Sequence, residues 1–184
     1  MRKLLTLTLL LGLAGAVAYG TYAAFTGTTA NGSNSFAGGT VTLASNSAAT
    51  PIYALTSRSP GDIGQGCVRV TYSGSLGSTV RLYRSTFTGG TGLDTYITLT
   101  VARGTGTQTD CSDFSSAATV YSGSLSALPS SYATGQSLTN ASGSAAWSQN
   151  DAVTYRITAQ LQNNTAAQGR GTGSHSFTWE ARNQ

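Results

Sequence analysis

Few side chains in this 184-residue sequence could carry out catalysis or hold a metal ion. The chain has one histidine, His175, and one glutamate, Glu180, and both fall on a candidate strand near its end. A zinc peptidase needs two histidines four residues apart on a helix, with a glutamate as general base. The sequence has neither that motif nor a helix to carry it. We therefore predict no zinc peptidase activity and interpret His175 as a solvent-facing strand residue.

Other catalytic or metal-binding patterns are equally weak. A hydrolase serine of the Gly-x-Ser-x-Gly type lies on a sharp turn before a helix, and no such turn precedes a helix here. Asp110 and Asp113 flank Cys111 and offer oxygen atoms of the kind that bind Ca2+. The calcium-loop pattern is absent, so we interpret both as parts of a solvated loop beside a disulfide. The sequence predicts no enzyme, and no catalytic, cofactor-binding or metal-binding residues.

The chain has few charged residues and many hydroxyl groups. Charged residues make up 9% of it, against about 25% in an average soluble domain. Serine occurs 24 times, threonine 29 times and glycine 23 times, whereas proline occurs only 3 times. With 39% hydrophobic residues the chain can still bury a core, which excludes a disordered linker. A β-rich domain exported from the cell fits this composition.

The net charge of +4 does not indicate a nucleic-acid partner. Arg2 and Lys3 account for two of the ten basic residues and belong to an N-terminal leader. The rest of the chain has eight arginines and six acidic residues, a net charge of only +2. Those arginines are scattered singly along the chain. A nucleic-acid-binding domain would instead gather basic side chains on one face. We predict no nucleic-acid binding.

The N-terminal residues have the layout of a secretory signal peptide. The basic pair is followed by an apolar stretch, Leu4 to Ala18, and small residues end the leader at Thr21 and Ala23, which predicts cleavage between Ala23 and Ala24. The alternative is a retained membrane anchor, but a membrane span needs about 20 apolar residues, and no basic cluster follows. We predict that residues 1–23 are removed and that the chain contacts the membrane only through them, before cleavage. The mature protein is then expected to be secreted to the extracellular matrix or cell surface.

Cys67 and Cys111 are the only cysteines, and they do not have the spacing of a CxxC motif. Export to an oxidising compartment favours a disulfide between them. That bond would close a long loop and contribute roughly 4 kcal/mol in the chain-entropy model. The alternative is a pair of buried free thiols.

Beyond the leader, apolar residues recur at every second position in short runs separated by Gly, Asn, Asp and Ser. The eight candidate strands are 35–44, 52–57, 68–72, 80–83, 97–101, 119–125, 153–161 and 177–182. The alternate positions are polar and often threonine, and no helical pattern lies between the runs. This predicts an all-β, antiparallel two-sheet β-sandwich of jelly-roll type with about eight strands. The Ser-, Ala- and Gly-rich segment 132–148 is predicted to be a long loop that leads to Trp147.

Four aromatic residues near the end of the chain are Trp147, Tyr155, Phe177 and Trp179. Their alternating positions favour packing in one shared core. If several instead faced outward on one flat surface, they would favour an adhesin or a carbohydrate-binding sandwich. Burial or exposure of these rings therefore distinguishes the two interpretations.

Two stretches near the leader junction are GTYAAF at positions 20–25 and FAGGTVTL at positions 36–43. Together they resemble the start of the TasA/camelysin family. Members of that family carry a leader that ends in a similar sequence and is processed by a SipW-type signal peptidase. The turn Pro60-Gly61-Asp62 and the aromatic segment 177–181 are also similar to that family. Some family members are described as metallopeptidases, a function that the missing zinc motif disfavours here.

The resemblance implies a structural subunit of a secreted fibre in a bacterial biofilm matrix, with a sandwich domain over residues 37–184. In such fibres the N-terminal segment of one mature subunit completes a sheet of the next, and the partner is thus another copy of the chain. The donor segment here would be 24–36, with Ala24 at its start and Phe25 and Phe36 as its large apolar residues. The alternative is that this segment is simply a frayed terminus.

Overall fold

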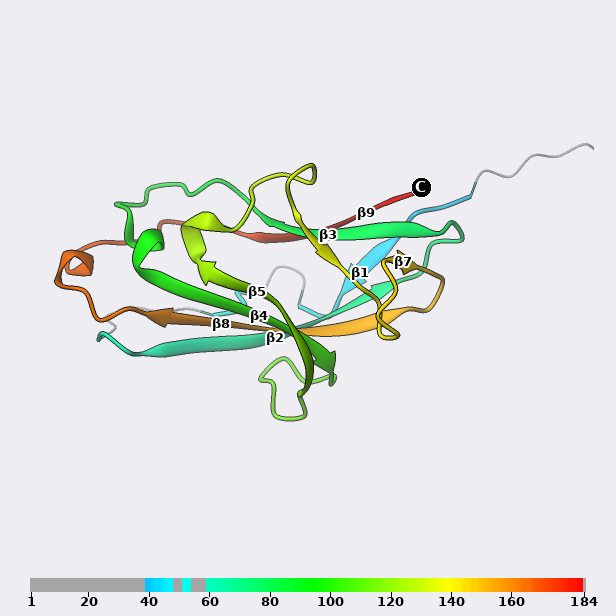
Figure 1. Cartoon of the computed structure of the whole chain (residues 1–184), viewed down its shortest axis with the longest axis horizontal. Helices are drawn as coiled ribbons and strands as arrows, with labels where there is room; N and C mark the ends of the chain where they lie inside the picture. The colour runs from blue at the N-terminus through cyan, green and yellow to red at the C-terminus, as the bar shows by residue number, and fades with distance from the viewer. Residues whose placement is uncertain (1–38, 48–50, 54–58, 184) are drawn as a thin grey trace, which may run out of the picture. The chain divides into compact units, whose positions relative to one another are not determined.

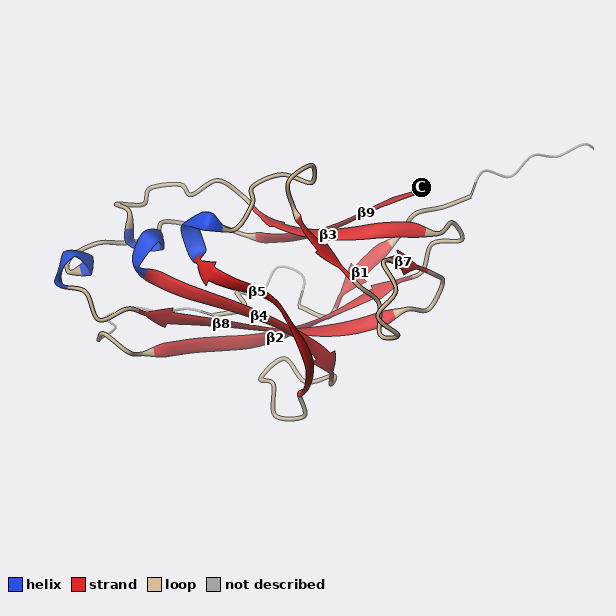
Figure 2. Cartoon of the chain, viewed as in Figure 1, coloured by secondary structure: helices blue, strands red, loops and turns tan. Residues whose placement is uncertain are grey.

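Two antiparallel β-sheets, of five and four strands, form a β-sandwich (Figure 1). The computed structural model describes residues 39–47, 51–53 and 59–183. The strands are β1 (Leu43–Ser45), β2 (Ile63–Tyr72), β3 (Ser78–Arg84), β4 (Ile97–Thr105), β5 (Ser115–Ser124), β6 (Gln136–Leu138), β7 (Ala146–Trp147), β8 (Ala152–Leu161) and β9 (Phe177–Asn183). Three short 3-10 helices are η1 (Leu93–Tyr96), η2 (Leu125–Ala127) and η3 (Thr165–Ala167), and Figure 2 shows them toward one end of the sandwich.

The larger sheet, here sheet A, has the strand order β1-β2-β8-β4-β5. Strand β8 lies at its centre and pairs antiparallel with both β2 and β4. The smaller sheet, sheet B, is built around β3. Strand β9 pairs with β3 along its whole length, and the short strands β6 and β7 also pair with β3.

The core lies between the sheets and consists of the inward residues of the alternating runs. On β8 these are Val153, Tyr155, Ile157 and Ala159, whose exposed fractions are at most 2%. Trp147 of sheet B is fully buried among them. Full burial of one such large side chain contributes about 1.5–3 kcal/mol. The outward residues remain polar, as an antiparallel sheet with one solvated face requires.

The loop 106–114 between β4 and β5 folds back onto the outer face of sheet A, where it projects below the sheet in Figure 1. The disulfide Cys67–Cys111 fastens it to β2, which confirms the predicted pairing. Cys67 also donates its backbone N–H to the Thr109 carbonyl at 2.9 Å. The guanidinium of Arg156 on β8 lies 4.9 Å from the centre of the Phe114 ring. These contacts hold the loop at three points.

The two aspartates of this loop, Asp110 and Asp113, are exposed and serve its backbone. Asp113 accepts hydrogen bonds from the backbone N–H groups of Thr107 and Gln108, at 2.7 and 3.0 Å. Asp110 accepts one from the backbone N–H of Ser112 at 3.0 Å. These hydrogen bonds favour the charged carboxylates and lower the pKa of both aspartates.

The predicted sandwich is confirmed, with nine strands among the described residues rather than about eight. Some local predictions were wrong: in the described part of the candidate strand 35–44 only Leu43 and Ala44 lie in a strand, and segment 132–148 contains β6 and β7 instead of one long loop. These strands are three and two residues long, too short to show an alternating pattern, and their pairing with β3 places them. In the candidate strand 52–57, Ile52 and Tyr53 are not in a strand, and residues 54–57 lie outside the described part.

Candidate functional site

The edges of the two sheets differ in length and regularity. Strand β1 has three residues, and β6 and β7 have three and two. Strand β5 has ten residues, but its register with β4 shifts twice. Strand β9 has seven residues in continuous register with β3. Within the described part of the chain, β9 is therefore the long regular edge, the kind that can accept a further strand.

The backbone of β9 alternates between groups that face β3 and groups that face away from it. Ser85 donates its N–H to the Ser176 carbonyl at 2.9 Å, so these residues form a hydrogen-bonded pair just before the ladder of β9. Hydrogen-bonded pairs alternate along an antiparallel ladder. The N–H and C=O groups of Phe177, Trp179 and Ala181 consequently point to the outer edge.

An open groove of about 730 Å³ runs along this edge, between β9 and β1. Its apolar wall is formed by Phe177 and Trp179 of β9, Leu43 of β1, Val70 of β2, and Ile52. All of these except Val70 are only partly buried, although they pack against the core. The sandwich is thus less tightly closed along this seam than at its centre.

Strand β1 presents its own edge to the same groove. Asn46 donates its N–H to the Arg69 carbonyl at 3.2 Å, and Ser73 donates to the Thr42 carbonyl at 3.0 Å. By the same alternation, the backbone groups of Leu43 point away from β2 and toward the seam. No backbone hydrogen bond joins β1 to β9 among residues 39–47, 51–53 and 59–183.

The indole of Trp179 is a polar group in the groove wall. Its Nε1 atom is buried and has no hydrogen-bond partner among the described residues. The ring lies 6.0 Å, between centroids, from that of the core residue Tyr155. A buried donor without an acceptor costs about 1–3 kcal/mol, and this cost falls on the folded monomer.

His175 closes one end of the groove, immediately before β9. Its Nε2 atom lies 3.0 Å from the Tyr53 hydroxyl, and its ring lies 5.2 Å from Phe87 and 5.6 Å from Phe177, between centroids. The prediction of a solvent-facing strand residue was wrong, because His175 is partly buried and outside any strand. Burial lowers the pKa of His175 and raises the pKa of Tyr53.

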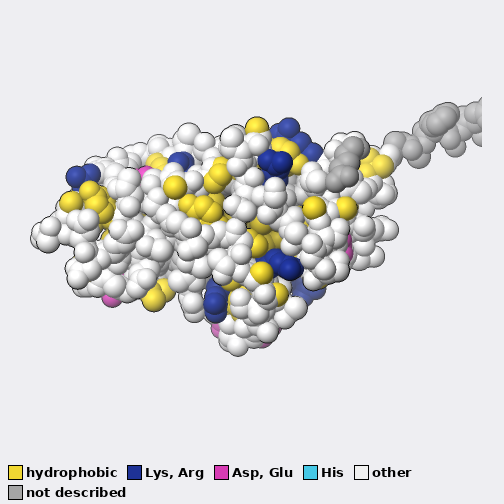
Figure 3. All heavy atoms as spheres, in the orientation of Figure 1, with side chains coloured by type: hydrophobic (Ala, Val, Ile, Leu, Met, Phe, Trp, Pro, Cys, Tyr) yellow, Lys and Arg dark blue, Asp and Glu magenta, His cyan; other side chains and the backbone are white. Residues whose placement is uncertain are grey.

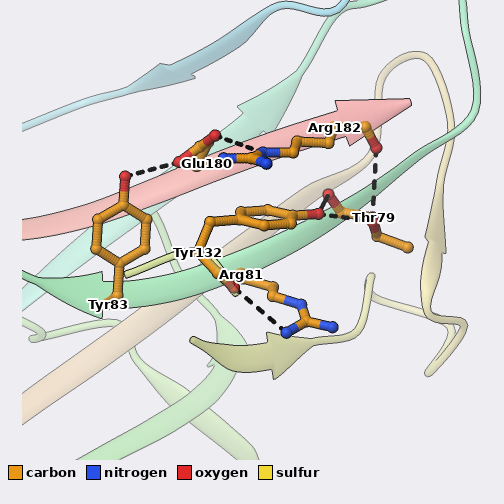
Figure 4. A network of polar contacts seen from close by, with 6 residues as sticks. All are labelled: Thr79, Arg81, Tyr83, Tyr132, Glu180 and Arg182. Carbon is orange, nitrogen blue, oxygen red and sulfur yellow. Dashed lines mark hydrogen bonds and ion pairs between the residues drawn. The ribbon is translucent and has the colours of Figure 1, made fainter. Parts of the chain in front are cut away.

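The outer face of β9 carries a polar network that ties it to β3 (Figure 4). Glu180 accepts a hydrogen bond from the Tyr83 hydroxyl and another from Arg182, both at 2.7 Å. The Tyr83 bond and then the Arg182 bond lower the pKa of Glu180, while the bond to Glu180 raises the pKa of Tyr83. Arg182 also stacks on Tyr132, 4.0 Å from the ring centre. These contacts lie on the face of β9 and on its β3 side, so the edge of β9 that points away from β3 stays open.

The other predicted site residues are placed as follows. Cys67 and Cys111 are joined, on the outer face of sheet A and away from the groove. Ala23, Ala24, Phe25 and Phe36 lie outside the described residues. The sequence analysis did not identify the groove, because a period-two pattern shows which residues face inward but not which strands become edges.

The described aromatic rings do not form an exposed platform. Trp147 and Tyr155 are fully buried, and Phe177 and Trp179 pack against the core. The large hydrophobic residues that are exposed in the described ranges are aliphatic: Val41, Ile63 and Leu76. Most of the surface visible in Figure 3 is uncharged polar side chain or backbone, with few charged groups.

The described ranges contain neither a cluster of metal-binding side chains nor a helix that could span a membrane. No group of three His, Cys, Asp or Glu side chains is arranged there to hold a metal ion. None of the helices in this part of the chain is long and apolar enough to cross a membrane. In sequence, the chain matches no protein-family model and no curated protein.

Proposed function

We propose that this protein is a secreted, non-catalytic structural subunit of extracellular matrix fibres. In this proposal, the segment 24–36 of one mature subunit adds as a strand to the outer edge of β9 in the next. The observation that carries it is the combination of a long regular edge strand with an apolar groove beside it. The resemblance of the leader junction to the TasA/camelysin family supports the same assignment.

The chemistry of the two parts is complementary. The outward backbone groups of β9 offer several hydrogen bonds to an added strand, each worth roughly 1 kcal/mol net. The donor segment carries Phe25 among Thr, Gly, Asn and Ser. Burying one Phe in the groove contributes on the order of 1.5–3 kcal/mol. Alone, such a segment buries little apolar surface, which favours a partner subunit over its own chain.

The disulfide and the leader support export. A disulfide persists in an oxidising compartment, and Cys67–Cys111 is formed. We propose that a SipW-type signal peptidase cleaves between Ala23 and Ala24, and N-terminal sequencing of the secreted protein tests this. The alternative is an adhesin or a carbohydrate-binding module, which would need several aromatic rings exposed on one flat surface. It is disfavoured because the four candidate rings pack in or against the core. These are Trp147, Tyr155, Phe177 and Trp179.

Deleting residues 24–34 tests the proposal directly. Electron microscopy should show filaments of the full mature protein and none of the truncated one. Because the described sandwich begins after the deleted residues, the truncated protein should remain a folded, soluble monomer by size-exclusion chromatography. Truncated protein that still forms filaments like those of the full chain would rule out the donor-strand mechanism.

A single substitution, Phe25→Ala, refines the test. It keeps the backbone of the segment and removes the ring that would occupy the groove, so filaments should form more slowly or at a higher protein concentration. Phe25→Leu, which restores most of the apolar volume, should recover assembly. Equal assembly by all three proteins would exclude a role for this ring.

A further inference from the structure

The contact between Tyr53 and His175 lies where two cavities meet. The groove beside β9 is on one side, and a second cavity of about 1030 Å³ is on the other. Pro51, Tyr53 and His175 line both. The contact joins the segment 51–53 to the residues that lead into β9, so it forms the end wall of the groove. A weaker contact between Tyr53 and His175 would allow this end of the groove to widen.

The hydrogen bonds of this contact suit a neutral imidazole. The Tyr53 hydroxyl donates to Nε2 of His175 when that nitrogen carries no proton, at 3.0 Å. The other nitrogen, Nδ1, then carries the proton and faces the Gly173 carbonyl at 3.4 Å. Protonation turns Nε2 into a donor. The Tyr53 hydroxyl must then rotate to accept, and its own hydrogen loses the acceptor it had.

The surroundings also disfavour a charged ring. His175 is packed between Phe87 and Phe177, and this burial is the largest cause of its lowered pKa. The hydrogen bond to the Gly173 carbonyl is the next largest cause and raises the pKa of His175. Smaller effects come from Arg84 at the end of β3, which lowers the pKa by repulsion, and from Asp94 on η1, which raises it. The remaining charged side chain lining the second cavity is Arg170, which is bonded to the carbonyls of Ala166 and Thr91.

His175 is also the only histidine in the chain. Histidine is the side chain whose ordinary pKa, about 6.5, lies between pH 5 and 8. The carboxylates with resolved shifts, Asp110, Asp113 and Glu180, have lowered pKa values and stay charged in that range. His175 is therefore the side chain expected to change its charge when the described domain meets mild acid.

We propose that His175 and Tyr53 form an acid-sensitive latch on the groove beside β9. At neutral pH the uncharged imidazole holds residues 51–53 against the start of β9 and narrows this end of the groove. In mild acid, protonation reverses the direction of this hydrogen bond and places a positive charge between the Phe87 and Phe177 rings, and the wall loosens. The latch concerns the wall of the groove and holds whether or not the segment 24–36 is its occupant.

Acrylamide quenching of tryptophan fluorescence tests the latch. The two tryptophans report different places: Trp179 lines the groove, and Trp147 is fully buried. Quenching should increase when the pH is lowered from about 7.5 to about 5, across the range in which histidine titrates. NMR of the single histidine should show a titration midpoint below its ordinary value. Far-ultraviolet circular dichroism should be unchanged, because only the wall moves.

Two matched variants separate the latch from a general acid effect. His175→Gln retains an acceptor for Tyr53 but cannot titrate, so its quenching should be the same at both pH values. Tyr53→Phe retains the ring and removes the hydrogen bond, which should raise the histidine midpoint toward its ordinary value. Equal quenching of the unmodified protein at both pH values would overturn the proposal. So would a pH response that persists in His175→Gln, or loss of the β-sheet signal at about pH 5.

Discussion

The two long edge strands of the sandwich, β5 and β9, are built in opposite ways. Strand β5 contains two extra residues relative to β4, Ala117 and Val120, where the register shifts. Strand β9 has no shift against β3 and turns the aromatic residues Phe177 and Trp179 toward the core. Bulges twist an edge and interrupt the row of backbone groups that another strand would need.

The difference between the two edges would give the proposed fibre a single direction of assembly. Three of the four sheet edges are short or bulged, which discourages pairing with other chains. Among the strands in the described ranges, only β9 combines length, regular register and an adjacent apolar groove. In the proposed assembly, a subunit with two good edges would form ribbons or aggregates, whereas one acceptor edge and one donor segment would give a linear fibre.

The largest expected effect comes from a proline in β9. Ala181→Pro removes a backbone N–H that points to the outer edge of β9. Because this N–H makes no hydrogen bond to β3, the pairing of β9 with β3 tolerates a proline here. The monomer should stay folded, but an added strand would lose a hydrogen bond and clash with the ring. We expect filaments to be absent by electron microscopy.

The matched control lies on β5. Gln162 donates its N–H to the Tyr96 carbonyl at 2.9 Å, and the alternation from that pair places the N–H of Ser122 on the outer edge of β5. Ser122→Pro should therefore leave both folding and filaments intact. Filament loss in both variants, or in Ser122→Pro alone, would contradict the assignment of β9 as the acceptor edge.

The second expected effect concerns the loop that leads into β5. Replacing Cys67 and Cys111 together by alanine removes the bond that fastens this loop to sheet A. The free energy of unfolding should fall by roughly 4 kcal/mol, because the unfolded chain gains freedom. Urea denaturation of the two proteins measures this difference. Filaments should still form from the folded fraction, because the loop is remote from β9; their loss at full folding would link assembly to β5.

The sequence was sufficient for some of these features and insufficient for others. Alternation identified long strands such as β8, and the presence of only two cysteines behind a predicted signal peptide indicated that they pair with each other. The position of His175 could not be obtained this way. Its neighbours continue an alternating pattern, but Thr88 and Ser174 exchange backbone hydrogen bonds that direct the chain beside Phe87 before β9 begins.

The groove could not be predicted for a related reason. Its walls come from β1, β2, β9 and residues 51–53, which are far apart in the sequence. Phe177 and Trp179 have the same pattern as the core residues of β8, yet they stay partly exposed because β9 has a neighbour on one side only. Exposure at this seam is set by topology, which local patterns do not encode.

A third, smaller effect tests the polar group in the groove wall. Trp179→Phe removes the indole N–H, which has no partner among the described residues. The lost packing and the removed unpaired donor act in opposite directions, so the free energy of unfolding of the monomer should change by less than about 1 kcal/mol. A loss well above that in urea denaturation would mean that the indole is hydrogen-bonded. Trp147→Ala, at a fully buried site, should cost about 3–5 kcal/mol by comparison.

The smallest expected effect concerns the network that holds β9 to β3. Glu180→Gln keeps the shape of the side chain but removes its charge, so the bonds from Tyr83 and Arg182 weaken. The loss in the free energy of unfolding should be below about 1 kcal/mol, as for other surface ion pairs.

The pH dependence of this loss identifies its cause. Because the pKa of Glu180 is lowered in the folded protein, its contribution is present above the ordinary pKa of glutamate, about 4.3, and is lost as the pH falls through the lower folded value. Denaturation at neutral pH should therefore separate the two proteins slightly, and denaturation in strong acid should not. A difference that stayed constant across this range would assign the effect to packing rather than charge, and filaments should form from both proteins because the network lies on the outer face of β9.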